Sequence, residues 1–226
     1  MVWFKAEYEF GSLFSYRMPD FSSQYALSLP LPGPSTIKLA TVATAIESTG
    51  NLKYGKEIFE LIKNAEIKIG MPKRIGISNV LIKRLKKKKD KKELETTFGI
   101  RGYVHFLEPI EIYVNAKEYA RDIGNLLRRI RRFGTSDSLV CCKSPISEEE
   151  PPENCIEAVD HFPEKAERNM LVVPVKDLNQ DEKVRFEHVN PYDEAPSKDV
   201  FVRKFYFIPI LNSREGKNWT VYEVAP

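Results

Sequence analysis

The first predicted element is a β-strand over residues 2–10. Ala6, Tyr8 and Phe10 alternate there with charged side chains, and a period of two places apolar residues on one face of a strand. The prolines of residues 29–34 then exclude a regular helix or a central strand, because proline lacks an amide donor and has a fixed φ. The chain therefore passes from a strand into irregular structure.

A helix is predicted next, over residues 37–48. Ser35 and Thr36 precede it, and hydroxyl side chains at that place cap free amides. Gly50 follows the helix as a stop signal. The same amides and hydroxyls suit a phosphate, but the glycine spacing excludes a nucleotide-hydrolysing P-loop.

Strand-like and helix-like spacings of apolar residues continue through the rest of the first 145 residues. The pattern predicts, in chain order, a helix over 56–64, a strand over 65–71, a hairpin over about 72–100, a strand over 103–114 bent near Pro109, a helix over 116–132 and a strand over 135–142. This order predicts an α+β, ferredoxin-like (RRM-like) βαββαβ domain with an inserted hairpin, in which two helices cover one face of an antiparallel sheet.

The composition changes after residue 145. Residues 147–153 form an acidic linker that contains two prolines. Short β-like runs follow at 170–175, 183–188, 200–210 and 219–224, separated by Pro, Asn and Asp. We therefore expect two domains, 1–145 and a small β-rich C-terminal domain over 146–226.

Charge is distributed unevenly between these parts. The 226 residues carry a net charge of +3. Residues 1–143 hold 25 basic and 15 acidic side chains, a net +10, whereas residues 144–226 hold 10 basic and 17 acidic ones, a net −7. A net positive part of this size favours a polyanionic partner, whereas the acidic part does not.

The predicted hairpin is the most basic segment. Residues 73–92 contain 10 basic side chains and one acidic side chain, Asp90. Such a density neutralises phosphates without reading sequence. The alternative is a solvated lysine-rich turn, but the length of the hairpin and the β-branched residues of its arms favour an element that reaches out to a polyanion.

Arginines mark two further places. Residues 128–132 carry four arginines at a helix end, where cations either complement the helix dipole or contact phosphates. Arg101 begins a basic-Gly-aromatic run like that of RNA-recognition sheets, although a buried core strand also explains this run. We expect Arg101, Arg128 and Arg131 to contact RNA.

Other chemistry is not encoded. The three cysteines, Cys141, Cys142 and Cys155, lack the spacing of a disulfide framework or a zinc ribbon, and the histidines lack the spacing of a metal site. No apolar run is long enough for a membrane span, so a cytoplasmic protein without membrane contact, metal or cofactor is expected.

These features resemble those of the CRISPR-associated RAMP proteins, and more narrowly the Cas five family of type I Cascade complexes. The residues that carry the resemblance are the first strand, the segment 31–40 that opens the first helix, the hairpin over 72–97 and the turn over 133–138. The length and the proline-rich segment look most like the archaeal I-A branch.

The resemblance implies a non-catalytic subunit that caps the 5′ handle of the guide RNA (crRNA) in antiviral defence. Its implied handle contacts are Arg17, Ser35, Thr36 and Lys38, and its implied thumb contacts are Lys73, Arg74, Lys83 and Arg84. The implied partners are crRNA, the Cascade backbone subunit and the large subunit, with target DNA contacted indirectly.

Two alternatives remain from the sequence. The first is a metal-independent endoribonuclease that processes precursor crRNA, in which His105 acts with Tyr103 and Lys83. The second is a soluble adaptor whose lysine-rich tip only increases solubility.

Overall fold

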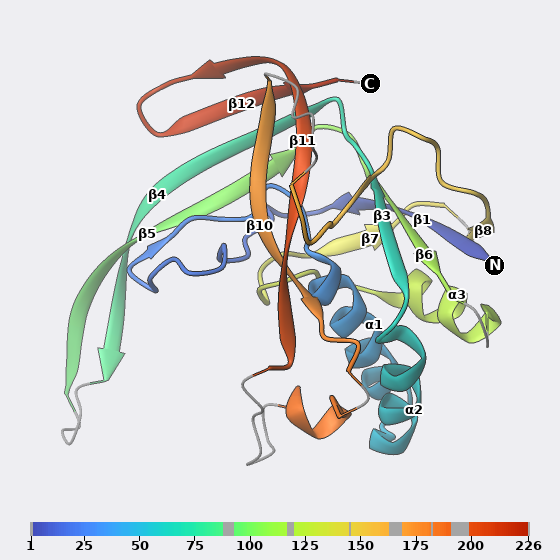
Figure 1. The fold of residues 1–226 in the computed structure, drawn as a ribbon. Coiled ribbons are helices and arrows are strands. Elements are labelled where there is room, and N and C mark those ends of the chain that lie inside the picture. The colour runs from blue at the N-terminus through green and yellow to red at the C-terminus, as the bar shows by residue number, and fades with distance from the viewer. Residues whose placement is uncertain are drawn as a thin grey trace.

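The computed structural model of the chain describes residues 2–87, 93–116, 120–144, 146–162, 169–181, 183–190 and 199–225. These residues form an α+β protein with two sheets and three α-helices, and most of the regular structure is strand. Figure 1 shows the helices gathered together, while a long two-stranded ribbon extends away from them. The tip of that ribbon, residues 88–92, lies outside the described residues.

The first sheet is antiparallel. Its strands are, in spatial order, β7 (Val140–Cys142), β1 (Trp3–Phe10), β6 (Ile110–Asn115), β3 (Glu66–Gly70) and β9 (Ile156–Glu157), and β8 (Ser147–Glu148) also pairs with β1. The register aligns Ala6 with Ile112 and Ile112 with Ile69, so apolar side chains form a row across three strands. The predicted strands over 2–10 and 65–71 are confirmed.

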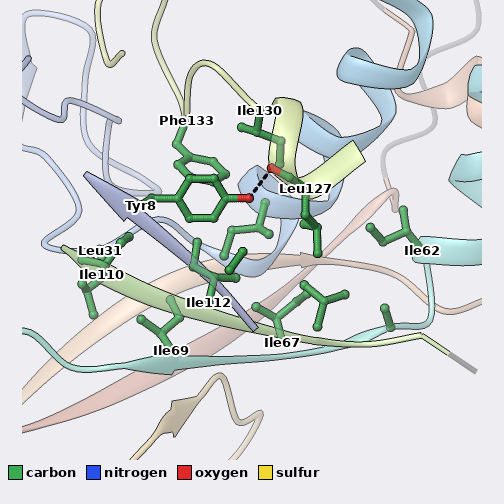
Figure 2. Close-up of a cluster of buried hydrophobic side chains, with 14 of the residues drawn as sticks. Tyr8, Leu31, Ile62, Ile67, Ile69, Ile110, Ile112, Leu127, Ile130 and Phe133 are labelled. Atoms are coloured by element: carbon green, nitrogen blue, oxygen red, sulfur yellow. Dashed lines mark hydrogen bonds between the residues drawn. The ribbon is translucent and has the colours of Figure 1, made fainter. Parts of the chain in front are cut away.

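Three helices cover this row. They are α1 (Pro34–Thr49), α2 (Leu52–Ile62) and α3 (Ala120–Arg129). Figure 2 shows Ile112 and Ile69 of the sheet in one buried cluster with Leu127 of α3. Burial of such aliphatic side chains contributes ~1.5–3 kcal/mol each and holds the helices on the sheet.

The start of α1 differs from the prediction. Gly33 occupies the N-cap position, Pro34 begins the helix, and no side chain caps it. The predicted capping by Ser35 and Thr36 is therefore wrong. Proline is favoured at the first helical position because its missing amide hydrogen would have no partner within the helix.

The second sheet contains the long ribbon. Its strands are, in spatial order, β10 (Met170–Leu178), β11 (Phe201–Glu215), β12 (Trp219–Val224), β4 (Arg74–Lys87), β5 (Leu94–Phe106) and β2 (Tyr25–Ala26). β4 and β5 pair without a register shift from Ile75 and Phe106 to Lys87 and Leu94. The predicted hairpin is thus present over its described residues.

Three predicted strands are corrected. Residues 103–114 do not form one bent strand: β5 ends at Phe106 in the second sheet and β6 begins at Ile110 in the first, because Pro109 interrupts pairing between them. Only Val140–Cys142 of the predicted strand 135–142 is extended, and residues 135–138 form a turn. Within 183–188, Phe186–His188 is a 3₁₀ turn, η1.

The C-terminal residues contribute to both sheets. β8 and β9 join the first sheet, and β12 pairs with β4 of the second. The acidic C-terminal part thus pairs with strands of the basic N-terminal part in both sheets. The division into domains 1–145 and 146–226 stays a prediction.

Candidate nucleic-acid interface

A groove lies between α1 and the segment that follows α3. Two hollows of about 980 and 390 Å³ adjoin there and share Thr44, Glu47, Arg131 and Leu139 in their walls. The larger hollow extends along β7, and the smaller one extends toward the start of α1. We call the combined hollow the arginine groove; its walls also include Tyr16, Thr36, Arg128, Arg129, Arg132 and Gly134.

Four exposed guanidinium groups give this groove its charge. Arg132 forms an ion pair of 2.7 Å with Glu47. No carboxylate of the described residues lies within ion-pair distance of Arg128, Arg129 or Arg131. These three guanidiniums are therefore available to an anion, and their planar donors match phosphate oxygens.

A buried tyrosine positions the arginines. The Tyr8 hydroxyl donates a hydrogen bond of 2.7 Å to the Leu127 carbonyl oxygen, and the Tyr8 ring packs edge-on against Phe133 at 4.9 Å (Figure 2). Burial raises the pKa of Tyr8 well above its ordinary value, so the phenol remains a donor. This contact ties the last turn of α3 to β1 and directs the arginines outward.

A glycine turn forms one end of the groove. Gly134 has a φ of +78°, and a Cβ at this position would lie 2.9–3.0 Å from the Tyr16 side chain. The buried Ser138 fixes the same turn, because its Oγ accepts a hydrogen bond of 2.9 Å from the Ser15 amide. Only glycine fits this backbone conformation and close approach without strain.

The predicted RNA contacts at the start of α1 lie in different environments. Ser35 is buried. Thr36 is 7% exposed and lines the groove, and its Oγ1 has no hydrogen-bond partner among the described residues. A buried hydroxyl without a partner is costly, so Thr36 is suited to bind a ligand in the groove.

Lys38, predicted as an RNA contact, lies in the protein interior instead. Its ammonium donates to Asp177 Oδ1 at 2.7 Å and to the Lys63 carbonyl oxygen at 3.1 Å. Asp177 also pairs with Lys204 at 2.9 Å. The expected contact of Lys38 with RNA is corrected: its side chain is fully buried, so its charge serves to join α1 to β10.

The predicted thumb residues lie on two faces of the ribbon. Directly opposed residues share a face of a sheet, and successive residues alternate between faces. Arg84 therefore lies on the same face as Arg74 and Arg101, whereas Lys83 lies opposite Phe98 on the other face. Arg84 and Lys83 are both exposed, and Arg101 is half-buried.

The residues of the ribonuclease alternative are not brought together. Tyr103 and His105 share a face of β5, but Lys83 is on the opposite face. Lys83 is paired with Phe98, seven residues from His105, which corresponds to about 23 Å along a strand. Burial also raises the pKa of the Cys142 thiol in the groove, which disfavours a thiolate nucleophile.

The remaining predicted RNA contacts lie partly inside and partly outside the arginine groove. Arg17 and Lys73 are exposed, and both lie outside the walls of the arginine groove. Arg128 and Arg131 lie in it, as do Arg129, Arg132, Tyr16 and Glu47, which were not chosen from the sequence. The run of four arginines was a signal for two of the missed residues; Tyr16 and Glu47 carry none.

The described residues lack the features of a metal centre and of a membrane-spanning helix. They contain no group of three or more His, Cys, Asp or Glu side chains arranged to hold a metal ion. None of their helices has the length and apolar character needed to cross a membrane.

Comparison with known proteins finds similarity to CRISPR-associated proteins in both sequence and fold. No family model matches the sequence. The chain is 43% identical over 230 residues to the CRISPR-associated protein Cas5 of Archaeoglobus fulgidus (strain ATCC 49558), with 99% of each chain covered. Its fold is similar to the crystal structure of a CRISPR protein from Archaeoglobus fulgidus, with a TM-score of 0.52 and 19% identity over 100% of this chain and 93% of that chain.

Proposed function

Because this chain belongs to the Cas5 family of CRISPR-associated proteins, we propose that it is a guide-RNA-binding subunit of a type I CRISPR effector complex, of subtype I-A. The family resemblance seen in the sequence is confirmed. The proposed role is to cap the 5′ handle of crRNA in antiviral defence, without cutting it. The proposed partners are crRNA, the backbone subunit and the large subunit, with target DNA contacted indirectly.

The observation that carries this proposal is the arginine groove. It combines three guanidiniums that lack a carboxylate partner among the described residues with a buried hydroxyl, Thr36 Oγ1, that lacks a hydrogen-bond partner there. Guanidiniums bind phosphates, and a hydroxyl binds a ribose or a base edge. Each nucleotide of a single-stranded RNA end carries a phosphate for the guanidiniums and a ribose and a base edge for the hydroxyl. This is the chemistry expected for a bound handle.

The ribbon supplies the second part of the proposal. Its exposed Arg84 and Lys83 point to opposite faces, so a ribbon of this kind contacts two surfaces at once. We assign it the role of a thumb that lies between the handle and the rest of the guide. The acidic C-terminal residues then face protein partners.

The framework of the first sheet supports the proposed ferredoxin-like fold. β1 and β3 are both antiparallel to β6, which lies between them, so β1 and β3 run in the same direction. β7 pairs antiparallel with the other edge of β1. A split βαβ arrangement of a ferredoxin-like domain, with α1, α2 and α3 as its connections, has this strand order, which supports the proposed fold.

Binding to a repeat RNA tests the function. The purified chain is titrated with a labelled CRISPR repeat RNA in EDTA across a salt series, and the length of the RNA is monitored. Single-strand binding loses a slope of about 0.7 in log affinity against log salt for each phosphate contact removed. The double variant Arg128→Glu/Arg131→Glu is therefore expected to lower the slope by at least about 1.4.

Lys183→Glu is the matched control, because it reverses an exposed charge outside the arginine groove. Equal losses in the control and the groove variant would contradict a specific groove. Cleavage of the RNA at a single position that His105→Ala abolishes would favour the endoribonuclease. Salt slopes that do not change in either variant would favour the soluble adaptor.

A further inference from the structure

The outer face of the second sheet carries an aromatic row. Trp219 of β12 pairs with Ser78 of β4, and Ser78 pairs with Tyr103 of β5. Paired residues share a face, so the indole and the phenol flank a short serine side chain. Two strand spacings separate the backbones of Trp219 and Tyr103, which is about 10 Å.

This face is open to solvent. The opposite face of the same three strands is buried at Ile75, Val104 and Val224. Trp219 is 47% exposed, and His105 in the next row is also exposed. Gly76 lies between Val221 and His105, so the middle strand has only small side chains where the outer strands have large ones. Little side-chain bulk therefore stands between Trp219 and Tyr103 on this face.

The turn between β11 and β12 holds the indole in place. The ring lies against Gly216, where a Cβ would approach the Trp219 Nε1 to 2.5 Å. The Gly216 amide donates a hydrogen bond of 2.8 Å to the Trp219 carbonyl oxygen. The indole Nε1–H has no hydrogen-bond partner among the described residues. An indole ring that is held in place and has a free N–H donor can bind a planar polar ligand.

Cations continue along the same face beyond these rings. Arg101 lies one row beyond Tyr103, paired with Val80, and Arg84 and Lys86 continue this face toward the ribbon tip. Glu95, paired with Lys86, is the acidic side chain of this stretch. Aromatic rings beside a track of cations are the pattern that binds single-stranded nucleic acid, with bases stacked on the rings and phosphates along the cations.

We propose that this face is a stacking site for an unpaired nucleobase of single-stranded nucleic acid, with Trp219 and Tyr103 as the stacking residues and Arg101 as a phosphate contact. The arginine groove does not include these residues. The ligand is a strand of RNA or of DNA, since both offer a base and flanking phosphates.

Tryptophan fluorescence tests this site directly. The chain has two tryptophans, and Trp3 is buried in the core. In a Trp3→Phe background, Trp219 is the sole reporter, and stacking of a base quenches it. Titration with ten-nucleotide oligouridine and with oligothymidine distinguishes RNA from DNA. We expect quenching that saturates with binding, and Trp219→Ala to weaken the affinity measured by anisotropy between about 5-fold and 150-fold.

Controls test the specificity of this site. Trp219→Phe keeps a ring and is expected to retain most of the affinity, whereas Leu211→Ala removes an exposed apolar side chain of β11 and is expected to have no effect. Lys183→Glu, which reverses an exposed charge outside both the arginine groove and this face, is expected to leave the quenching unchanged. The proposal would be overturned if the oligonucleotides bind without quenching Trp219 and bind Trp219→Ala with equal affinity. It would also be overturned if neither oligonucleotide binds to this face.

Discussion

The Tyr8 hydroxyl donates a hydrogen bond to the Leu127 carbonyl oxygen, and the two residues are 119 positions apart in the sequence. Both are buried, so this bond joins the centre of the first sheet to the last turn of α3. The Leu127 carbonyl oxygen also accepts a hydrogen bond of 3.2 Å from the Ile130 amide, which tightens the helix end, and Tyr8 supplies its second hydrogen bond. The arginine groove is thereby attached to the core.

Tyr8→Phe removes this bond and retains the ring. The Leu127 carbonyl oxygen keeps its hydrogen bond from the Ile130 amide, so only one hydrogen bond is lost. We expect the free energy of unfolding in urea to fall by ~0.5–1.5 kcal/mol, the net contribution of one such bond. RNA affinity is expected to fall as well, because the end of α3 is less fixed. Phe14→Leu, a change in the same core that removes no hydrogen bond, is the control for packing. Unchanged stability in Tyr8→Phe would show that the bond contributes nothing.

The buried ion pair between Lys38 and Asp177 predicts a second large effect. Asp177→Ala leaves the Lys38 ammonium buried without its carboxylate, whereas Lys204 is partly exposed and reaches water. Breaking a buried pair in this way costs ~3–5 kcal/mol. The double variant Lys38→Met/Asp177→Leu is expected to recover most of this loss, as thermal unfolding would measure. A double variant no more stable than Asp177→Ala would contradict the explanation.

Stability should depend on pH through the same lysine. Burial lowers the pKa of Lys38 below its ordinary value, although Asp177 opposes this shift. Between the folded and unfolded pKa values the unfolded chain binds more protons, so stability rises with pH toward 10.5. The free energy of unfolding of the wild type is therefore expected to rise relative to Lys38→Met as the pH is raised toward 10.5. A wild-type free energy of unfolding that falls relative to Lys38→Met as the pH rises would contradict this prediction.

Gly134→Ala tests the turn at the end of the groove. The positive φ of Gly134 costs ~1–3 kcal/mol for a residue with a Cβ, and the added methyl group also meets Tyr16. We expect lower stability and weaker RNA binding. Tyr16→Ala in the same chain is expected to remove the contacts with the Tyr16 ring atoms at 2.9 and 3.2 Å. The 3.0 Å contact with the Cβ of residue 16 and the backbone strain remain, so recovery in urea unfolding should be partial. Complete recovery would mean that the φ value carries no cost.

Local patterns in the sequence determined many of the elements. The alternation over 2–10 predicted β1, and the basic segment predicted the ribbon of β4 and β5. The run of four arginines predicted a charged helix end. These features depend on neighbours within a few residues, which a sequence contains directly. Such patterns do not give the role of the arginine charge. They also do not say whether residues 146–226 form a separate domain.

The tertiary structure decided which of the candidate residues meet. Lys38 follows the turn that opens α1, yet the partner that makes its burial possible, Asp177, is 139 residues away. Trp219 and Tyr103 become neighbours only because β12 and β5 pair with opposite edges of β4. The sequence alone determined the local periods and the charge of each segment. Long-range strand pairing, which depends on the register of distant segments, decided which charges are buried and which rings share a face.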